Sequence, residues 1–201
     1  MPASHARGWN ALGVETVIFQ ALWLMLPAYA ANPAAQLTGG GLPIDFGKRW
    51  RDGQPILGEG KTWRGLAGGL VGGIFIGGVQ IALAAAGDNP ALVPTFDPSL
   101  GPASPASFLV VFALALGALL GDAGKSFVKR RMHRPRGANL PIVDQYDFVF
   151  GAWVLSLLLF PTWFLVNFRV EVIVVVILIT FFLHRGISVL GYRMGLKAEP
   201  W

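Results

Sequence analysis

The chain has 201 residues, of which 54% are hydrophobic and 13% are charged, and its mean hydropathy is +0.56. This composition is typical of a membrane protein and excludes an ordinary water-soluble domain, and the absence of cysteine excludes disulfides and thiolate metal ligands. The formal net charge of +5 does not indicate nucleic-acid binding, because the basic residues flank apolar runs instead of forming one patch.

Five apolar runs are candidates for membrane-crossing helices, which need roughly 17 to 25 apolar residues. The five runs are Val14–Ala31, Leu66–Ala86, Phe108–Leu120, Phe148–Val166 and Val170–Leu190. The third run is long enough only if its helix continues into water. The first is predicted to be a retained helix, because no dense basic region precedes it and no clear cleavage site follows. We therefore predict an all-α, polytopic membrane protein with five transmembrane helices, whose cytoplasmic polar loops form the active site, and a single integral membrane domain over residues 1–201.

The basic residues are distributed unevenly between the two sides of this predicted bundle. Fourteen of the 16 lie between the first two runs, between the third and fourth runs, or in the C-terminal tail, and only Arg7 and Arg169 lie on the other side. Cytoplasmic segments of membrane proteins are enriched in Lys and Arg. The asymmetry therefore predicts an external N-terminus and a cytoplasmic C-terminus, which is the parity that five spans require.

The second apolar run contains glycines that recur four residues apart. Its six glycines are Gly68, Gly69, Gly72, Gly73, Gly77 and Gly78. Small residues at this spacing let helices approach closely within a membrane. Because these glycines lie inside an apolar run, we predict close helix packing and not a nucleotide-binding loop.

The polar segment before the second run has the sequence "LPIDFGKRWRDGQPILGEGKTWRG" and mixes three acidic with five basic residues. Its end places Lys61, Thr62 and Arg64 at the start of a helix, where free backbone N–H groups favour a phosphate. The alternative is an interfacial anchor through Trp50 and Trp63. The two interpretations are compatible.

The motif "GDAGKS" resembles the end of a phosphate-binding P-loop, but the glycine that should stand five positions before Gly124 is Leu119. We predict instead that the third helix continues past the membrane to about His133. One face of that helix would carry Asp122, Ser126, Lys129 and His133, with Lys125, Arg130 and Arg131 beside them.

Asp144 and Asp147 stand three residues apart at the start of the fourth run, so they can face in one direction. Paired carboxylates beside cations suit Mg²⁺ and phosphates. The alternative is structural, with the acids complementing a helix dipole and the basic run "KRRMHRPR" contacting anionic lipids.

Three stretches, "GDAGKSFVKRR", "RPRGANLPIVDQYDF" and "PIDFGKRWRDGQPILGEGKTWRG", together resemble the archaeal CDP-archaeol synthases. More distantly the chain is similar to the CDP-diacylglycerol synthases, whose signature falls here on Gly121, Asp122, Ser126, Lys129, Arg130, Asp144 and Asp147. The chain departs from the distant family at Lys125, where an acid is common, and it lacks the glycine-histidine element before the last aspartates.

The resemblance implies a membrane cytidylyltransferase that uses CTP, an isoprenoid ether-lipid phosphate and Mg²⁺. It implies catalytic roles for Asp122, Lys129, Asp144 and Asp147, with Asp144, Asp147 and Asp122 as metal ligands. Ser126, Lys129, Arg130 and Arg136 would contact the CTP phosphates, and Lys61, Thr62 and Arg64 would bind the lipid phosphate or diphosphate.

Other classes of function remain open from the residues alone. An anion or lipid transporter would place ionisable groups or broken helices at mid-membrane, and an interaction scaffold would tolerate neutral replacement of Asp144 and Asp147. A CDP-alcohol phosphotransferase is not indicated, because "QPILG" follows Asp52-Gly53 where its motif would continue. The sequence leaves room for a homo-oligomer.

Overall fold

The structure is a computed structural model, and it describes residues 13–86, 104–134, 140 and 142–193. These residues form six helices: α1 (Val14–Thr38), α2 (Trp63–Ala86), α3 (Pro105–Arg131), α4 (Val143–Leu159), α5 (Pro161–Asn167) and α6 (Val170–Arg193). Within the described ranges there are two isolated β-bridges and no strand. The predicted all-α class is therefore confirmed.

Helices α1, α2 and α3 are long and apolar enough to cross a membrane. Helices α5 and α6 are bent by 78° relative to each other, and together they form a fourth span if the bent pair crosses the membrane as one segment. The outward faces of the helices are apolar, with Phe75, Leu158 and Phe182 each about two-thirds exposed or more. Such faces suit lipid better than water. The chain is a multi-pass membrane protein, and the count of five spans stays a prediction.

The predicted single helix over Phe148–Val166 is wrong, because the chain breaks at Phe160. Pro161 disfavours the helical region for the residue before it, and Phe160 has φ −136° and ψ 60°. α4 therefore ends at Leu159, and the short helix α5 begins at Pro161.

The third helix continues beyond its apolar run, as predicted, and ends at Arg131. His133 has a φ of 54°, in the left-handed region, so it lies outside the helix. The expectation that His133 shares the face of Asp122 and Lys129 is therefore wrong.

The glycines of α2 allow close packing against α1 and α3, as predicted. A Cβ atom added to Gly73 would lie 2.5 Å from Cβ of Ala115 in α3, and one added to Gly77 would lie 2.2 Å from a methyl group of Val111. On another face of α2, a Cβ on Gly72 would lie 2.4 Å from Cβ of Ala34 in α1.

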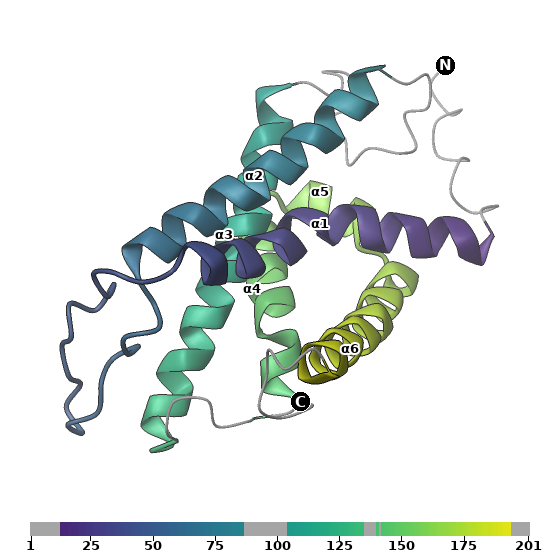
Figure 1. Cartoon of the computed structure of the whole chain (residues 1–201). Helices are drawn as coiled ribbons and strands as arrows, with labels where there is room; N and C mark the ends of the chain where they lie inside the picture. The colour runs from purple at the N-terminus through teal and green to yellow at the C-terminus, as the bar shows by residue number, and fades with distance from the viewer. Residues whose placement is uncertain (1–12, 87–103, 135–139, 141, 194–201) are drawn as a thin grey trace.

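Helices α3 and α4 run side by side through the middle of the molecule (Figure 1). Their contact depends on three glycines, Gly117, Gly121 and Gly151. A Cβ on Gly121 would lie 2.1 Å from the carbonyl oxygen of Asp147, and one on Gly151 would lie 2.2 Å from that of Gly117. The backbones of the two helices are thus in direct contact where the polar end of α3 begins.

The core lies where α1, α3, α4 and α6 meet. Its fully buried members include Leu24 and Met25 of α1, Val110 and Leu114 of α3, Val149 of α4 and Val176 of α6. Hydrogen bonds also join the helices through this apolar region. Gln80 Nε2, for example, donates to the carbonyl of Trp23 (2.7 Å), and the hydroxyls of Tyr29 and Thr180 lie 2.7 Å apart. Polar groups inside the bundle thus hold helices together.

Candidate active site

The segment between α1 and α2, residues 39–62, lies against the C-terminal part of α3, and Arg131 connects the two. The Arg131 guanidinium pairs with Asp52 (3.1 Å), donates to the carbonyl of Pro55 (2.5 Å) and lies 4.9 Å from the centre of the Phe127 ring. The edge of Trp50 also packs on Phe127, with ring centres 5.5 Å apart. Arg131 and Trp50 therefore hold this segment on α3.

Asp45 organises the interior of the same segment. One carboxylate oxygen accepts from the N–H of Gly47, and the other accepts from the N–H groups of Leu57 and Gly58 at 2.8 and 2.9 Å. Burial by itself would raise the pKa of Asp45, but hydrogen bonds from Gly58, Leu57 and Gly47 hold that pKa below its usual value. Asp45 therefore has a structural role within the segment. Lys61, at the end of the same segment, pairs with Asp122 of α3.

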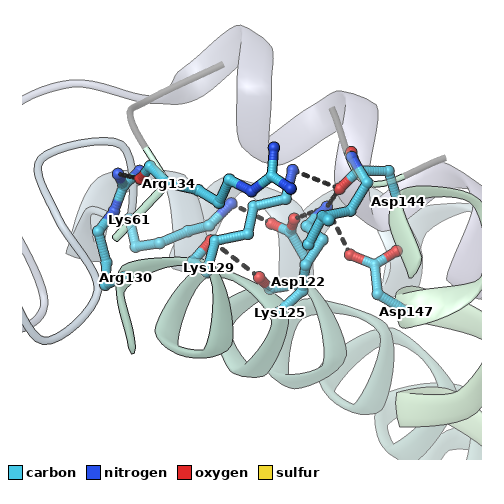
Figure 2. A network of polar contacts seen from close by, with 10 residues as sticks. Lys61, Asp122, Lys125, Lys129, Arg130, Arg134, Asp144 and Asp147 are labelled. Atoms are coloured by element: carbon cyan, nitrogen blue, oxygen red, sulfur yellow. Dashed lines mark hydrogen bonds and ion pairs between the residues drawn. The ribbon is translucent and has the colours of Figure 1, made fainter. Parts of the chain in front are cut away.

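Six charged side chains from three parts of the chain meet beside this segment, and we call them the ionic cluster (Figure 2). The cluster consists of Lys61 from the segment before α2, Asp122, Lys125 and Lys129 from α3, and Asp144 and Asp147 from α4. Its arrangement follows from the α3–α4 glycine contact. Gly121, which precedes Asp122, packs against the backbone of Asp147, so this contact brings two carboxylates of the cluster together.

Lys125 lies among the three carboxylates. Its Nζ atom is 2.9 Å from Oδ1 of Asp122, 2.6 Å from Oδ2 of Asp147 and 3.6 Å from Oδ1 of Asp144. Lys61 pairs with the other oxygen of Asp122. Lys129 Nζ lies 2.5 Å from Oδ1 of Asp144.

The cluster is mostly withdrawn from water, since exposed fractions of its side chains run from 4% for Asp147 to 24% for Lys61. Three carboxylates face three ammonium groups, which suits burial because an unpaired charge there is costly. Oδ1 of Asp144 and Oδ2 of Asp147 are buried, and each has an ammonium group as its partner, Lys129 at 2.5 Å and Lys125 at 2.6 Å.

Asp144 also makes a structural contact at the start of α4. Its Oδ2 accepts from the N–H of Leu140 (2.7 Å), which closes the turn that leads into α4. Its Oδ1 faces Lys129 and Lys125. Asp144 thus shapes the helix start with one oxygen and belongs to the cluster with the other.

Three other residues that the sequence assigned to phosphates make local contacts. Ser126 donates to the carbonyl of Asp122 (3.0 Å), and Thr62 accepts from the N–H of Gly65 (3.1 Å) at the start of α2. Arg64 donates to the carbonyls of Thr38 (2.7 Å) and Gly39 (2.9 Å), where α1 ends.

Arg130 lies near the glycine-rich segment, since a Cβ added to Gly58 would be 3.5 Å from its Nε atom. One end of its guanidinium donates to the carbonyl of Arg134 (2.6 Å), while Nε is buried and makes no hydrogen bond to any residue that the structure describes. Arg136 lies outside the described residues.

The sequence did not single out Lys125 as a member of the site. Two signals were present: it stands three residues after Asp122, one helical turn along α3, and it replaces an acid that is common in the distant family. Its partners on α4 depend on helix packing and could not be read from spacing.

No group of three or more metal-binding side chains within the described ranges is arranged to hold a metal ion. Carboxylate oxygens are nevertheless the donors that Mg²⁺ prefers, and oxygens of Asp122, Asp144 and Asp147 converge on the ammonium group of Lys125. The donor chemistry of these residues fits Mg²⁺, while the present arrangement places an ammonium group among the carboxylates.

Comparisons with known proteins cover almost the whole chain. Residues 14–201 match the CarS-like family, described as CDP-archaeol synthase. The chain is 49% identical over 177 residues to the CDP-archaeol synthases of Methanosarcina barkeri and Methanosarcina mazei, and 47% identical to that of Methanospirillum hungatei. Each alignment covers 88% of this chain and all of the relative.

The structure is also similar to a solved structure, described as that of an intramembrane enzyme for archaeal membrane lipid biosynthesis. The TM-score is 0.67 at 35% identity, over 85% of this chain and 94% of the other. These comparisons give no support to the transporter alternative. The chain belongs to the CarS-like family of CDP-archaeol synthases, which are membrane cytidylyltransferases of archaeal lipid biosynthesis.

Proposed function

We propose that the ionic cluster is where this cytidylyltransferase transfers CMP from CTP to an isoprenoid ether-lipid phosphate, unsaturated archaetidic acid, forming CDP-archaeol and diphosphate. The observation that carries this proposal is the convergence of Asp122, Lys125, Asp144 and Asp147 at the polar end of α3. A site there receives a charged nucleotide from water while the lipid chains stay among apolar helices.

The reaction does not require the protein to remove a proton from the attacking phosphate. The second pKa of a phosphate monoester is about 6, so near neutral pH the lipid phosphate is mostly a dianion. One of its oxygens attacks the α-phosphorus of CTP, and the bond from that phosphorus to the bridging oxygen of the β-phosphate breaks as diphosphate leaves. The residues of the site have to position two polyanions and neutralise their charge.

The lysines and arginines around the cluster supply that neutralisation. Lys129 and Arg130, together with Arg136, are proposed to contact the triphosphate. For Arg130, the support is the buried Nε beside Gly58 that makes no hydrogen bond within the described chain.

The start of α2 is proposed to receive the lipid phosphate or the diphosphate through Lys61, Thr62 and Arg64. Lys61 already faces the cluster through Asp122. Arg64 uses two of its N–H groups to hold the end of α1, and a guanidinium has five such donors. Thr62 contributes by capping α2, which fixes the position of Lys61 beside it.

Asp144 and Asp147, with Asp122 as a third ligand, are proposed to hold Mg²⁺. When bound, Mg²⁺ neutralises charge on the phosphates of CTP. Ser126 donates to the carbonyl of Asp122, so a hydrogen bond from its hydroxyl to CTP would replace that contact.

The site is proposed to face the cytoplasm, with the N-terminus outside and the C-terminus inside. The support is the 14-to-2 distribution of basic residues, together with the contacts that join the segment before α2 to the end of α3. A homo-oligomer is compatible with this arrangement.

The direct test is an incubation of the purified protein in detergent with Mg²⁺, labelled CTP and archaetidic acid. We expect a labelled CDP-lipid and one diphosphate for each CTP consumed. A folded protein that forms neither product would overturn the proposal, and a protein that instead moved the lipid or an anion across a vesicle membrane without CTP would be a transporter.

A further inference from the structure

Lys125 holds an unusual position in the ionic cluster, because its one ammonium group lies within 3.6 Å of oxygens from all three carboxylates. Lys61 and Lys129 instead approach the cluster beside Asp122 and Asp144, respectively. Figure 2 shows Lys125 reaching from α3 toward Asp122, Asp144 and Asp147. A single cation surrounded by three carboxylates from two helices has the charge environment of a bound metal ion.

Burial makes this position demanding. The side chain of Lys125 is 16% exposed and that of Asp147 is 4% exposed. Three carboxylates this close repel one another in a medium less polar than water, so they need a cation in their midst. In the structure that cation is an ammonium group that the chain itself carries, one helical turn from Asp122.

We propose that Lys125 is a positioning residue that acts as a tethered cation: in the protein without metal it takes the place among Asp122, Asp144 and Asp147 that a divalent ion would take. This inference rests on the proposed function only in assigning those carboxylates to a metal. The ammonium group keeps the three carboxylates together before substrate arrives. It also competes with the metal, because a divalent ion enters only after Lys125 has moved away.

The proposal has two measurable consequences without any turnover. Replacing Lys125 by Met keeps a chain of similar length and removes the charge, so a divalent ion should bind more tightly. The same variant should be less stable in chelator than the wild-type protein, because Asp147 loses its ammonium partner and Asp122 and Asp144 each keep only one. It should also gain more stability from added metal.

The test measures binding of Mn²⁺, as a paramagnetic substitute for Mg²⁺, to the full chain in detergent without CTP, by the spin-resonance signal of free Mn²⁺. We expect Lys125→Met to lower the Mn²⁺ dissociation constant at least tenfold. Lys61→Met and Lys129→Met remove the same unit of charge from the edges of the cluster and serve as matched controls. We expect each of them to change the constant less than threefold, and Lys125→Arg to stay near the wild-type value.

The outcomes separate the possibilities. Equal tightening by all three Met variants would mean that only net charge matters, and this would overturn the tethered-cation role, as would unchanged or weaker binding by Lys125→Met. If Lys125→Met unfolds in chelator, melting of protein purified in Mn²⁺ replaces the titration, and the proposal then requires a larger metal-dependent rise in melting temperature than in wild type.

Failure of the proposed function gives a different result. In that case neither the wild-type protein nor any Lys variant would show saturable Mn²⁺ binding that depends on Asp147. Asp147→Asn would then leave the Mn²⁺ signal unchanged. Binding that is sensitive to Asp147→Asn but identical in wild type and Lys125→Met would leave the metal site in place and remove only the role of Lys125.

Discussion

Asp147 is the most buried carboxylate of the ionic cluster, with 4% of its side chain exposed, and its partner in the structure is Lys125 at 2.6 Å. Asp144 has two tasks, because one oxygen closes the turn before α4 and the other faces the lysines. A helix-start role and a ligand role therefore predict different results for the same substitution, and this makes the pair suitable for mutagenesis.

Replacing Asp144 or Asp147 by Asn should lower the rate of CDP-lipid formation a hundredfold or more. At Asp144, Asn keeps the size and can still accept from Leu140 N–H, so a role in the helix start alone would be affected by only about 1 kcal/mol. A lost metal ligand removes several kcal/mol of charge stabilisation from the transition state, at roughly 1.4 kcal/mol per tenfold in rate. The measurement is turnover of each variant with Mg²⁺ titrated and folding checked by thermal melting.

Asp52→Asn is the matched control for that experiment. Asp52 pairs with Arg131 at 3.1 Å and is 29% exposed, and surface ion pairs contribute about 0 to 1 kcal/mol. We expect it to keep most of its activity. Near-normal turnover by folded Asp144→Asn and Asp147→Asn would show that the pair is structural.

Lys61 and Arg64 are three residues apart, but their contacts predict separate effects. Lys61→Ala removes a charge from the cluster. We therefore expect the KM for lipid phosphate to rise more than the KM for CTP. Arg64→Ala removes two hydrogen bonds to the end of α1, so we expect a lower melting temperature as well. Steady-state kinetics and melting in detergent measure the two. A larger rise in the CTP KM for Lys61→Ala would move Lys61 to the nucleotide site.

At the scale of elements, the contact between α3 and α4 determines whether the cluster forms. Gly117 and Gly121 of α3 meet Gly151 and the backbone of Asp147 with no room for a Cβ. Because Asp147 belongs to the cluster, any increase in the distance between the helices also moves its carboxylate away from Lys125. Packing and chemistry are coupled at this contact.

Gly121→Ala should therefore destabilise the protein and lower its activity. Its Cβ would lie 2.1 Å from the carbonyl oxygen of Asp147, a backbone atom that cannot rotate aside, and overpacking of this kind typically costs about 1 to 3 kcal/mol. Gly124→Ala is the control on the same helix, since nothing lies within 4 Å of its added Cβ. Alanine there should be neutral or stabilise by up to about 1 kcal/mol. Equal melting temperatures and activities for the two variants would contradict this view of the contact.

At the scale of the whole molecule, the segment before α2 and the polar end of α3 lie at the same end of the bundle (Figure 1). Together with Arg64 at the start of α2, the described residues of these two regions carry 10 of the 16 basic residues. One face of the protein is thus both strongly basic and the location of the cluster. The positive-inside rule predicts that this face lies in the cytoplasm.

The orientation can be tested by single-cysteine labelling, since the chain has no native cysteine. In intact cells, a cysteine at Asn89 should react with an impermeant thiol reagent, and one at Arg134 should react only after the membrane is opened. A cysteine at Gly53, in the segment held by Arg131, should behave like the one at Arg134. Protection at Asn89 with external labelling at Arg134 would reverse the orientation and contradict the predicted five-span topology.

Composition and the pattern of apolar runs determined the class of this protein: an all-helical membrane protein with charged segments between its helices. These are local properties of the chain, as is the glycine spacing of α2, so they could be read without a structure. The end of α3 was predicted within two residues, because nothing before Pro135 stops that helix. Pro161 was a local signal too, and it marks the break at Phe160 that the prediction of a single fourth helix ignored.

Only the tertiary structure decided which charges meet. From the sequence, Asp122, Lys129, Asp144 and Asp147 were predicted to share one candidate site. Lys125 was placed only beside that site, and Thr62 and Ser126 were predicted to bind phosphates. In the folded chain Lys125 lies among three carboxylates, while Thr62 and Ser126 bond to nearby backbone. The physical reason is that ion pairing depends on a few ångströms between side chains, and that separation is set by the glycine contact between α3 and α4, whose members are up to 34 residues apart in the sequence.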